Sequence, residues 1–524
     1  MARRAQPLGG WGGAGAASVA LVLTLVFGTL AAVALRAEGP AALGPADLAA
    51  VRFTVLQALL SAGLSCLLAV PVARALARRR FAGRGLLVTL LGAPFLMPAI
   101  VAVLGLLAVF GRAGLISRGL GLLGLPPLDI YGLHGVVLAH VFLNLPLATR
   151  LVLQGWLAIP AERFRLAASL GLGPGEVARL LERPMLRAVL PGAFAAIFLV
   201  CLTSFTVALI LGGGPRATTV ELAIYQAFRY EFDLGRAALL ALVQVGLTLA
   251  AAAGAMAFAL PGALGAGLDR AVERWDAEGR GRRLIDAALI ALAAGFLILP
   301  LAALAAEGAV ALARLPGSVW MAALRSLVVA LAAAGLALGL ALPLALLAQR
   351  RQGRAAGRMA EATGYLTIAA SPLVMGTGLF ILTFPYADPA RLALALTALV
   401  NAAMALPFAM RAILPALRAA EADFGRLADG LGLAGWARLR IAVLPRLARP
   451  MGFAAGLAAA FSMGDLGVIA LFGDPAHATL PLEMFRLMSA YRMEQAMGTA
   501  ILLMAASLAL FWAFDRGGRL DARV

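Results

Sequence analysis

The chain has 524 residues, of which 62% are hydrophobic and only 13% are charged, and its mean hydropathy is +0.94. Soluble domains are about 45–50% apolar and about 25% charged, so this composition indicates a polytopic membrane protein. The net charge of +18 would be typical of a nucleic-acid-binding protein in a soluble chain, but here the arginines follow the membrane topology, and we expect no nucleic-acid partner.

Apolar runs long enough to cross a bilayer recur along the whole chain. A membrane-spanning helix needs about 20 mostly apolar residues. We therefore predict an all-α protein with twelve transmembrane helices. They lie at about 16–35, 53–73, 86–110, 131–153, 188–211, 237–260, 284–306, 320–347, 363–384, 392–414, 450–472 and 495–514. The first run could instead be a signal peptide after Arg3 and Arg4, but it is long for that role.

The arginines set the expected orientation of these helices. Cytoplasmic loops of membrane proteins carry an excess of basic residues. With both termini in the cytoplasm, the inner loops hold that excess, including the clusters at 78–80, 282–283 and 350–351. An odd number of spans would reverse this asymmetry, so the distribution favours an even count.

The sequence also contains a long internal repeat. Residues Asn144–Gln226 align with Ala405–Leu487 without a gap, at a constant offset of 261. We predict two six-helix halves, 1–262 and 284–524, joined by a cytoplasmic linker at 263–283. Because each half has an even number of spans, the halves share one orientation and form a parallel repeat.

Each copy of the repeat contains a charged, glycine-punctuated loop between two apolar runs. The first repeated loop lies at about 157–187 and the second repeated loop at about 418–448. Each reads as a helix, a glycine bend and a short second helix on the cytoplasmic side. One such loop could simply lie on anionic membrane lipid. Two copies with the same spacing favour a docking element for a soluble partner.

Several chemistries are disfavoured by the residue types present. All 44 basic residues are arginine, so the chain lacks the Gly-Lys-Ser/Thr of a Walker A phosphate loop. Any ATP must therefore be bound by another chain, and we expect no cofactor on this one. Cys66 and Cys201 lie in apolar runs, and His134, His140 and His477 lack metal-ligand spacing. We expect neither a disulfide nor a metal site.

The repeated loops resemble the cytoplasmic motif of ABC importer permeases, in which Glu-Ala-Ala, three residues, Gly, nine residues and Ile-x-Leu-Pro contact the ATPase. The matching residues are Ala167, Gly171 and Pro184 in the first loop and Ala428, Gly432 and Pro445 in the second. The departures are Arg165 and Arg426 at the glutamate position, with Leu181 and Ala442 at the isoleucine position. We assign the eight docking positions to these matches and to the two arginines.

This resemblance covers nearly the whole chain and implies a type I ABC importer permease fold. It implies a membrane translocation subunit that is not itself an enzyme, placed in the bacterial inner membrane. Its expected partners are a pair of ABC ATPase subunits and a periplasmic solute-binding protein. ATP-driven closure of the ATPases would then rock the two halves between inward and outward openings.

Two families of fused double permeases fit, those for thiamine and those for ferric iron. The stretches 203–228 and 462–473 resemble thiamine permeases, although Asp-Leu-Gly followed by Val also occurs in iron permeases. The resemblance thus implies transport of thiamine, and possibly of its phosphates, with ferric iron as the alternative. An ion-coupled secondary transporter is an alternative of another class. It would predict paired intramembrane acids, and Asp465 has only Ser204 at the equivalent position.

A few polar or glycine positions are candidates for the translocation pathway, namely Ser204, Asp465, Gly213, His140 and Asn144. A carboxylate inside a membrane is costly, so a functional role is the default hypothesis. Asp465 could balance the positive charge of thiamine, or it could bind backbone at a helix break between two nearby glycines. His140 and Asn144 share one helix face, and Gly213 lies in a glycine run where unwound backbone can line a cavity.

Overall fold

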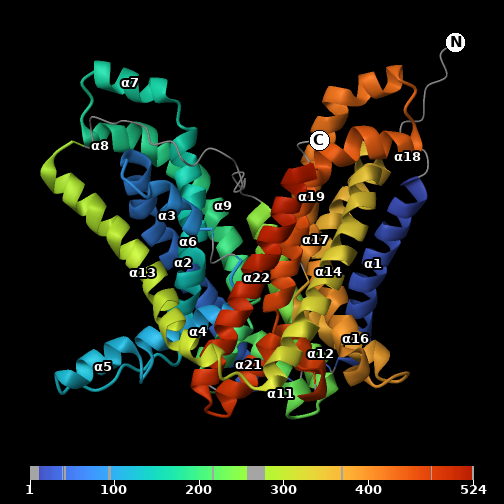
Figure 1. Cartoon of the computed structure of the whole chain (residues 1–524), viewed down its shortest axis with the longest axis horizontal. Helices are drawn as coiled ribbons and strands as arrows, with labels where there is room; N and C mark the ends of the chain where they lie inside the picture. Colours follow the sequence, from blue (N-terminus) through green and yellow to red (C-terminus); the bar gives the residue numbers. More distant parts are fainter. Residues whose placement is uncertain are drawn as a thin grey trace. The chain divides into compact units, whose positions relative to one another are not determined.

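The computed structural model describes residues 11–37, 39, 43–92, 96–214, 217–256, 278–367, 370–473 and 475–521, and every regular element among them is a helix (Figure 1). Eleven helices in these ranges are long and apolar enough to cross a membrane, and one further apolar helix, α16 (Pro372–Thr383), is shorter. The protein is therefore an all-α, multi-pass membrane protein, as the composition predicts. The layout of twelve spans in two parallel repeats stays a prediction.

The helices form two compact units that differ from the two halves of the sequence. Unit 1 comprises 1–42, 224–245 and 308–524, and unit 2 comprises 43–223 and 246–307. The first helix of each sequence half thus belongs mostly to the unit built from the other half. The boundaries 1–262 and 284–524 describe the two halves of the sequence repeat. The helices, however, pack into the two units given above, whose boundaries differ. Residues 263–277 of the expected linker lie outside the described residues.

Unit 2 carries the first repeated loop. Its elements are α2 (Pro45–Arg78), α3 (Arg84–Leu90), α4 (Ala99–Phe110), α5 (Leu115–Leu122), α6 (Leu133–Ala158), α7 (Ala161–Ser169), α8 (Pro174–Val177), the π-helical segment η3 (Ala178–Glu182), α9 (Arg183–Leu202), α10 (Thr206–Leu211) and most of α13 (Arg280–Leu312). In this unit α7 and α8 lie at one end of α6 and α9, and α5 lies at the opposite end (Figure 1).

Unit 1 carries the second repeated loop. Its elements are α1 (Trp11–Arg36), most of α11 (Val220–Arg229), part of α12 (Leu234–Met256), α14 (Gly317–Arg350), α15 (Ala355–Leu366), α16, α17 (Pro389–Gly430), α18 (Gly435–Ala437), the π-helical segment η7 (Arg438–Val443), α19 (Leu444–Gly464), α20 (Gly467–Phe472), the 3₁₀ turn η8 (Pro475–His477), α21 (Leu480–Ser489) and α22 (Met493–Asp521).

Four of the predicted spans are broken helices, at matching places in the two sequence halves. The predicted span 86–110 is divided into α3 and α4, and the span 363–384 is divided into α15 and α16. Pro98 directly precedes α4, and Pro372 begins α16. Proline lacks the N–H that would continue a helix and pushes the preceding residue to extended backbone. The spans 188–211 and 450–472 are broken too, after α9 and after α19.

Helix α2 shows how helices pack in a lipid bilayer, where the hydrophobic effect does not drive them together. Small residues on one face of α2 are buried against α6 and α9, namely Ala58, Ala62, Cys66 and Ala69. Between Phe53 and Arg78 of the same helix, the exposed side chains are leucines, namely Leu56, Leu59, Leu60, Leu64, Leu67 and Leu68. Lipid tails are as apolar as leucine, so close approach of small residues holds membrane helices together.

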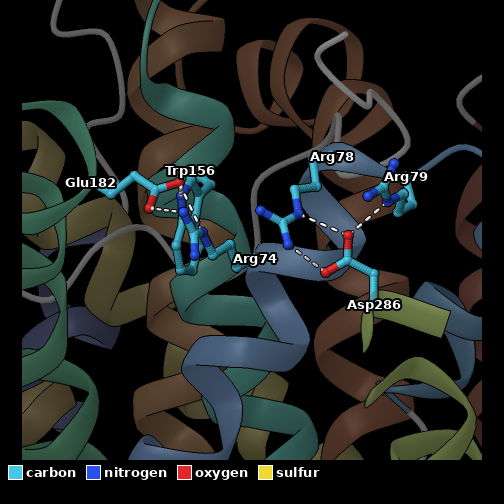
Figure 2. Close-up of polar contacts among 6 residues, drawn as sticks. All are labelled: Arg74, Arg78, Arg79, Trp156, Glu182 and Asp286. Atoms are coloured by element: carbon cyan, nitrogen blue, oxygen red, sulfur yellow. Dashed lines mark hydrogen bonds and ion pairs between the residues drawn. The ribbon is translucent and has the colours of Figure 1, made fainter. Parts of the chain in front are cut away.

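The helices that begin the two sequence halves pack tightly in their units. In unit 1, a Cβ built on Gly15 of α1 would lie 2.6 Å from the Cβ of Leu347 on α14. This close packing places α1 directly against α14. In unit 2, Asp286 of α13 accepts hydrogen bonds from Arg78 (2.9 and 2.5 Å) and from Arg79 (2.6 Å) at the end of α2 (Figure 2). Asp286 and Arg78 are both buried.

We expect Asp286→Asn to destabilise the protein by about 2–3 kcal/mol, because hydrogen bonds to charged groups are worth about 1.5–3 kcal/mol and their loss leaves guanidinium groups uncompensated. The measurement is thermal unfolding of the purified protein in detergent. The matched control is Asp388→Asn at the exposed start of α17, where asparagine can still accept from the Ala390 N–H. Equal melting temperatures for the two variants would contradict a structural role for the Asp286 ion pair.

Candidate functional site

The two repeated loops adopt the same backbone structure at their central glycine. The N–H of Gly171 donates to the carbonyl of Ala168 (3.0 Å), and that of Leu172 donates to the carbonyl of Ala167 (3.0 Å). The second loop repeats this pair of bonds, from Gly432 to Asp429 (3.1 Å) and from Leu433 to Ala428 (2.9 Å). This is the Schellman ending of a helix, which needs a residue with positive φ.

Gly171 and Gly432 have φ values of +65° and +68°. Residues with a Cβ resist this left-handed conformation. The conformational need of the helix ending therefore explains why both loops carry glycine there.

A π-helical segment leads each loop into the next membrane helix. η3 ends just before Arg183 and Pro184, and η7 ends just before Leu444 and Pro445. A proline leaves one backbone carbonyl without its usual helical N–H partner, and single π turns are common at functional sites. Both Pro184 and Pro445 are solvent-exposed. Thus the motif proline, Pro184 or Pro445, is a surface residue that lies just after a π-helical segment.

The pattern of exposed side chains is repeated between the loops. Ala167 and Ala428 are buried, which fixes the face that each loop turns toward its unit. The opposite face exposes matched pairs separated by 261 residues, namely Leu166 and Leu427, Leu170 and Leu431, Leu180 and Ile441, Arg165 and Arg426, and Arg179 and Arg440. We call these ten residues the paired loop surface. Each loop therefore presents apolar and basic side chains in the same order.

The first repeated loop is held to its unit by a buried carboxylate. Glu182 in η3 accepts hydrogen bonds from the indole N–H of Trp156 on α6 (3.3 Å) and from the guanidinium of Arg74 on α2 (3.2 Å) (Figure 2). The side chain of Glu182 is 5% exposed. This network joins the loop to two membrane helices, so a force applied to the loop would reach both.

The second repeated loop is held by a different charge network. Arg438 in η7 is buried and forms ion pairs with Glu421 (2.6 Å) and Asp429 (2.5 Å), which both lie in the last turns of α17. No break separates the membrane-spanning part of α17 from the loop, since the helix runs without interruption from Pro389 to Gly430. In unit 2, by contrast, Ile159 and Pro160 separate α6 from α7.

The arginines that replace the motif glutamate are exposed at both positions. Arg165 lies 3.5 Å from Glu162 on the same short helix, and both side chains are more than 70% exposed. Such a surface pair contributes little to stability. Arg165 therefore adds little to the internal structure of its loop, and Arg426 is exposed at the equivalent position of the second loop.

The candidate pathway residues of unit 2 meet at the break between α9 and α10. The Nε2 atom of His140 on α6 lies 2.8 Å from the Oγ of Ser204 in the break, and its Nδ1 atom lies 3.3 Å from the Oγ of Ser61 on α2. In a neutral imidazole one nitrogen donates and the other accepts, so both serine contacts can form together. Asn144 donates to the carbonyl of His140 (2.9 Å) and lies 3.4 Å from the Cys201 sulfur.

Unit 1 contains the equivalent contact at the break between α19 and α20. Asn401 on α17, which is 261 residues after His140, donates to the Oγ of Ser462 (3.0 Å) and lies against the carboxylate of Asp465. Asp465 in turn accepts from the N–H of Gly467 (3.2 Å). Asn401, Ser462 and Ser61 were not among the sequence candidates. The sequence could have identified Asn401: adding the repeat offset of 261 to His140, which lies four residues before the start of the aligned repeat, gives position 401.

Gly213 lies apart from these clusters, beyond the end of α10. Its φ is +72°, and a Cβ built on it would lie 2.9 Å from the Cβ of Tyr131. Glycine at this position thus permits a close approach to the segment before α6. Among the described residues, no group of three or more His, Cys, Asp or Glu side chains is placed to hold a metal ion.

We expect Gly171→Ala and Gly432→Ala each to destabilise the helix ending of their loop by about 1–2 kcal/mol, the cost of a left-handed residue with a Cβ. Faster amide hydrogen exchange in residues 166–172 or 427–433, measured by mass spectrometry, would report this change.

The matched control is Gly175→Ala in α8, where the added Cβ has no neighbour within 4 Å and φ is not positive. Because alanine is the better helix former, the control should not accelerate exchange. Equal exchange in all three variants would show that the positive φ is not what requires glycine.

Comparison with known proteins gives full-length relatives, although no family model matches the chain. The thiamine transport system permease protein ThiP of Brucella abortus (strain 2308) is 40% identical over 517 residues, which cover 96% of this chain and 94% of the relative. The protein of the same name from Salmonella typhimurium is 38% identical over 529 residues, or 98% of each chain. That of Escherichia coli (strain K12) is 38% identical over 481 residues, covering 89% of this chain and 88% of the relative.

Proposed function

The chain belongs to the family of thiamine transport system permeases, and we propose that it carries thiamine, and possibly its phosphates, across the bacterial inner membrane as the translocation subunit of an ATP-driven importer. The observation that carries this proposal is the identity of 38–40% to permeases of that name over 89–98% of the chain. The ferric-iron and ion-coupled alternatives have no comparable support. A chain without lysine leaves ATP hydrolysis to a partner.

The two repeated loops are the proposed docking sites for two ATPase subunits. An exposed apolar group rimmed by charge is typical of a protein interface. The paired loop surface offers such a group twice, with leucine or isoleucine at three matched positions and arginine at two. Two identical subunits related by a pseudo-two-fold axis would meet the same surface on each loop. Because each loop displays arginines, the complementary groove on the ATPase should carry carboxylates.

Motion of the ATPases would reach the membrane helices through the anchoring networks of the loops. In unit 2 the path runs through Glu182 to α2 and α6, and in unit 1 it runs along α17 itself. Buried ion pairs with good geometry are rigid connections, since breaking one leaves an uncompensated charge. The loops are thus suited to transmit force in either direction.

The orientation of unit 1 supports cytoplasmic ends for the chain. A Cβ on Gly12, at the start of α1, would lie 3.1 Å from the guanidinium of Arg350 at the end of α14. A Cβ on Gly518, near the end of α22, would lie 2.5 Å from the carbonyl of Ala448 at the start of α19. The second repeated loop lies at this same end (Figure 1). Basic residues there would contact anionic lipid, and the opposite end would receive a periplasmic solute-binding protein.

We expect Leu166→Gln and Leu427→Gln each to weaken ATPase binding about tenfold, equivalent to about 1.4 kcal/mol, and the double variant to abolish stable association. Both leucines are 60% exposed, so their replacement should not disturb the fold. The measurement is co-purification and titration of the ATPase subunit on the permease in lipid nanodiscs.

The matched control is Leu122→Gln, because Leu122 is 91% exposed at the end of α5, on the opposite side of unit 2 from α7 and α8 (Figure 1). This control should bind the ATPase like the wild type. If the double loop variant also binds normally, the paired loop surface is not the docking site.

The substrate assignment is tested by reconstituting the permease, its ATPase and candidate binding proteins in liposomes. Thiamine-loaded binding protein should stimulate ATP hydrolysis and drive uptake of labelled thiamine. Stimulation by an iron-loaded binding protein, with no response to the thiamine-loaded one, would overturn the assignment.

A further inference from the structure

The two units differ in charge at their equivalent helix breaks. At the break in unit 2 the residue is Ser204, and 261 residues later at the break in unit 1 it is Asp465. The neighbouring helix supplies His140 in unit 2 and Asn401 in unit 1. The same backbone arrangement thus carries a neutral cluster in one unit and a carboxylate in the other.

The carboxylate of Asp465 is only partly satisfied by the protein. One oxygen, Oδ1, accepts at 3.2 Å from the N–H of Gly467, the first residue of α20, and so binds the start of that helix from the residue before its N-cap, Leu466. The other oxygen, Oδ2, is buried and forms no hydrogen bond with the described residues; the nearby amide of Asn401 donates to Ser462 instead. In unit 2, by contrast, both ring nitrogens of His140 are engaged by serine hydroxyls.

An incompletely paired carboxylate within a membrane-spanning segment has a large desolvation cost. Helix capping alone does not require this cost, because a neutral asparagine or serine is an equally good cap. No arginine of the described chain forms an ion pair with Asp465. The retained negative charge therefore calls for a positive group that the described residues do not provide.

We propose that Asp465, at the break after α19, is a specificity-determining contact for the cationic ring of the substrate. This inference rests on the proposed transport of thiamine, whose thiazolium ring carries a permanent positive charge. Oδ2 of Asp465 balances that charge, while the hydrogen bond from Gly467 to Oδ1 holds the carboxylate at the break. A solute without a cationic ring gains nothing from this contact.

The same two helices carry an aromatic pair that suits a flat cation. Phe408 of α17 and Phe461 of α19 meet edge to face with ring centroids 5.2 Å apart. Phe461 directly precedes Ser462, which binds Asn401. The equivalent residues in the first half are Leu147 and Val200. Aromatic rings attract cations through their faces, so this pair adds a second cation-attracting group to the two helices that carry Asn401 and the break at Asp465.

Three substitutions separate the charge of Asp465 from its capping role. Asp465→Asn keeps the cap and removes the charge, and it also mimics a protonated acid. Asp465→Glu keeps the charge with altered reach, and Asp465→Ala removes both. We expect Asp465→Asn to lower thiamine uptake by about tenfold or more, equivalent to about 1.4 kcal/mol, and Asp465→Glu to restore a large part of it.

The measurement is ATP-driven uptake of labelled thiamine by the complete importer in liposomes, with binding-protein-stimulated ATP hydrolysis recorded in parallel. Hydrolysis should stay near the wild-type rate in Asp465→Asn, since docking is intact. Asp388→Asn, the exposed cap of α17, is the matched control and should transport normally. Wild-type uptake by Asp465→Asn would overturn the role of Asp465, whereas no thiamine uptake by the wild-type importer would overturn the proposed function.

Discussion

A helix that breaks inside a membrane must have its freed backbone groups bound by neighbouring side chains, and much of this structure follows from that constraint. The carbonyl of Cys201 next to the first break accepts from the amide of Gln57 on α2 at 2.8 Å. The N–H groups that open α11 and α21 are bound by hydroxyls of distant helices, Thr54 of α2 for Val220 and Ser326 of α14 for Leu480. These polar side chains inside α2 and α14 thus bind backbone groups where other helices begin or end.

The two units satisfy this constraint with different chemistry at equivalent positions. In unit 2, His140 and Ser204 form a neutral contact. At the equivalent break of unit 1, Asn401 lies beside the charged Asp465. A fused chain can diverge in this way because each half is encoded separately. A homodimer of half-length subunits would have to repeat every residue on both sides. Fusion thus permits one unit to carry a carboxylate at its break while the equivalent break of the other stays neutral.

The loops show the opposite tendency, since their outer surfaces are alike and their attachments differ. The matched leucines and arginines of the paired loop surface face solvent in both copies. Beneath them, Glu182 anchors one loop to α2 and α6, and Arg438 anchors the other to the end of α17. A partner that binds both loops constrains only the surface, so the buried anchors are free to change as long as the loop stays rigid.

The sequence by itself determined the helical membrane class, because composition and apolar runs reflect the solvent that surrounds the chain. It also determined the repeated loops, because Gly171 and Gly432 are required by a local helix ending. The full-length relatives confirm the permease family expected from those loops. The tertiary structure decided what depends on neighbours far apart in the chain. It placed α1 and α13 with helices of the opposite sequence half, paired Asp286 with Arg78, and set Asn401 beside Asp465. Such contacts arise from packing between helices, and local sequence patterns carry no record of them.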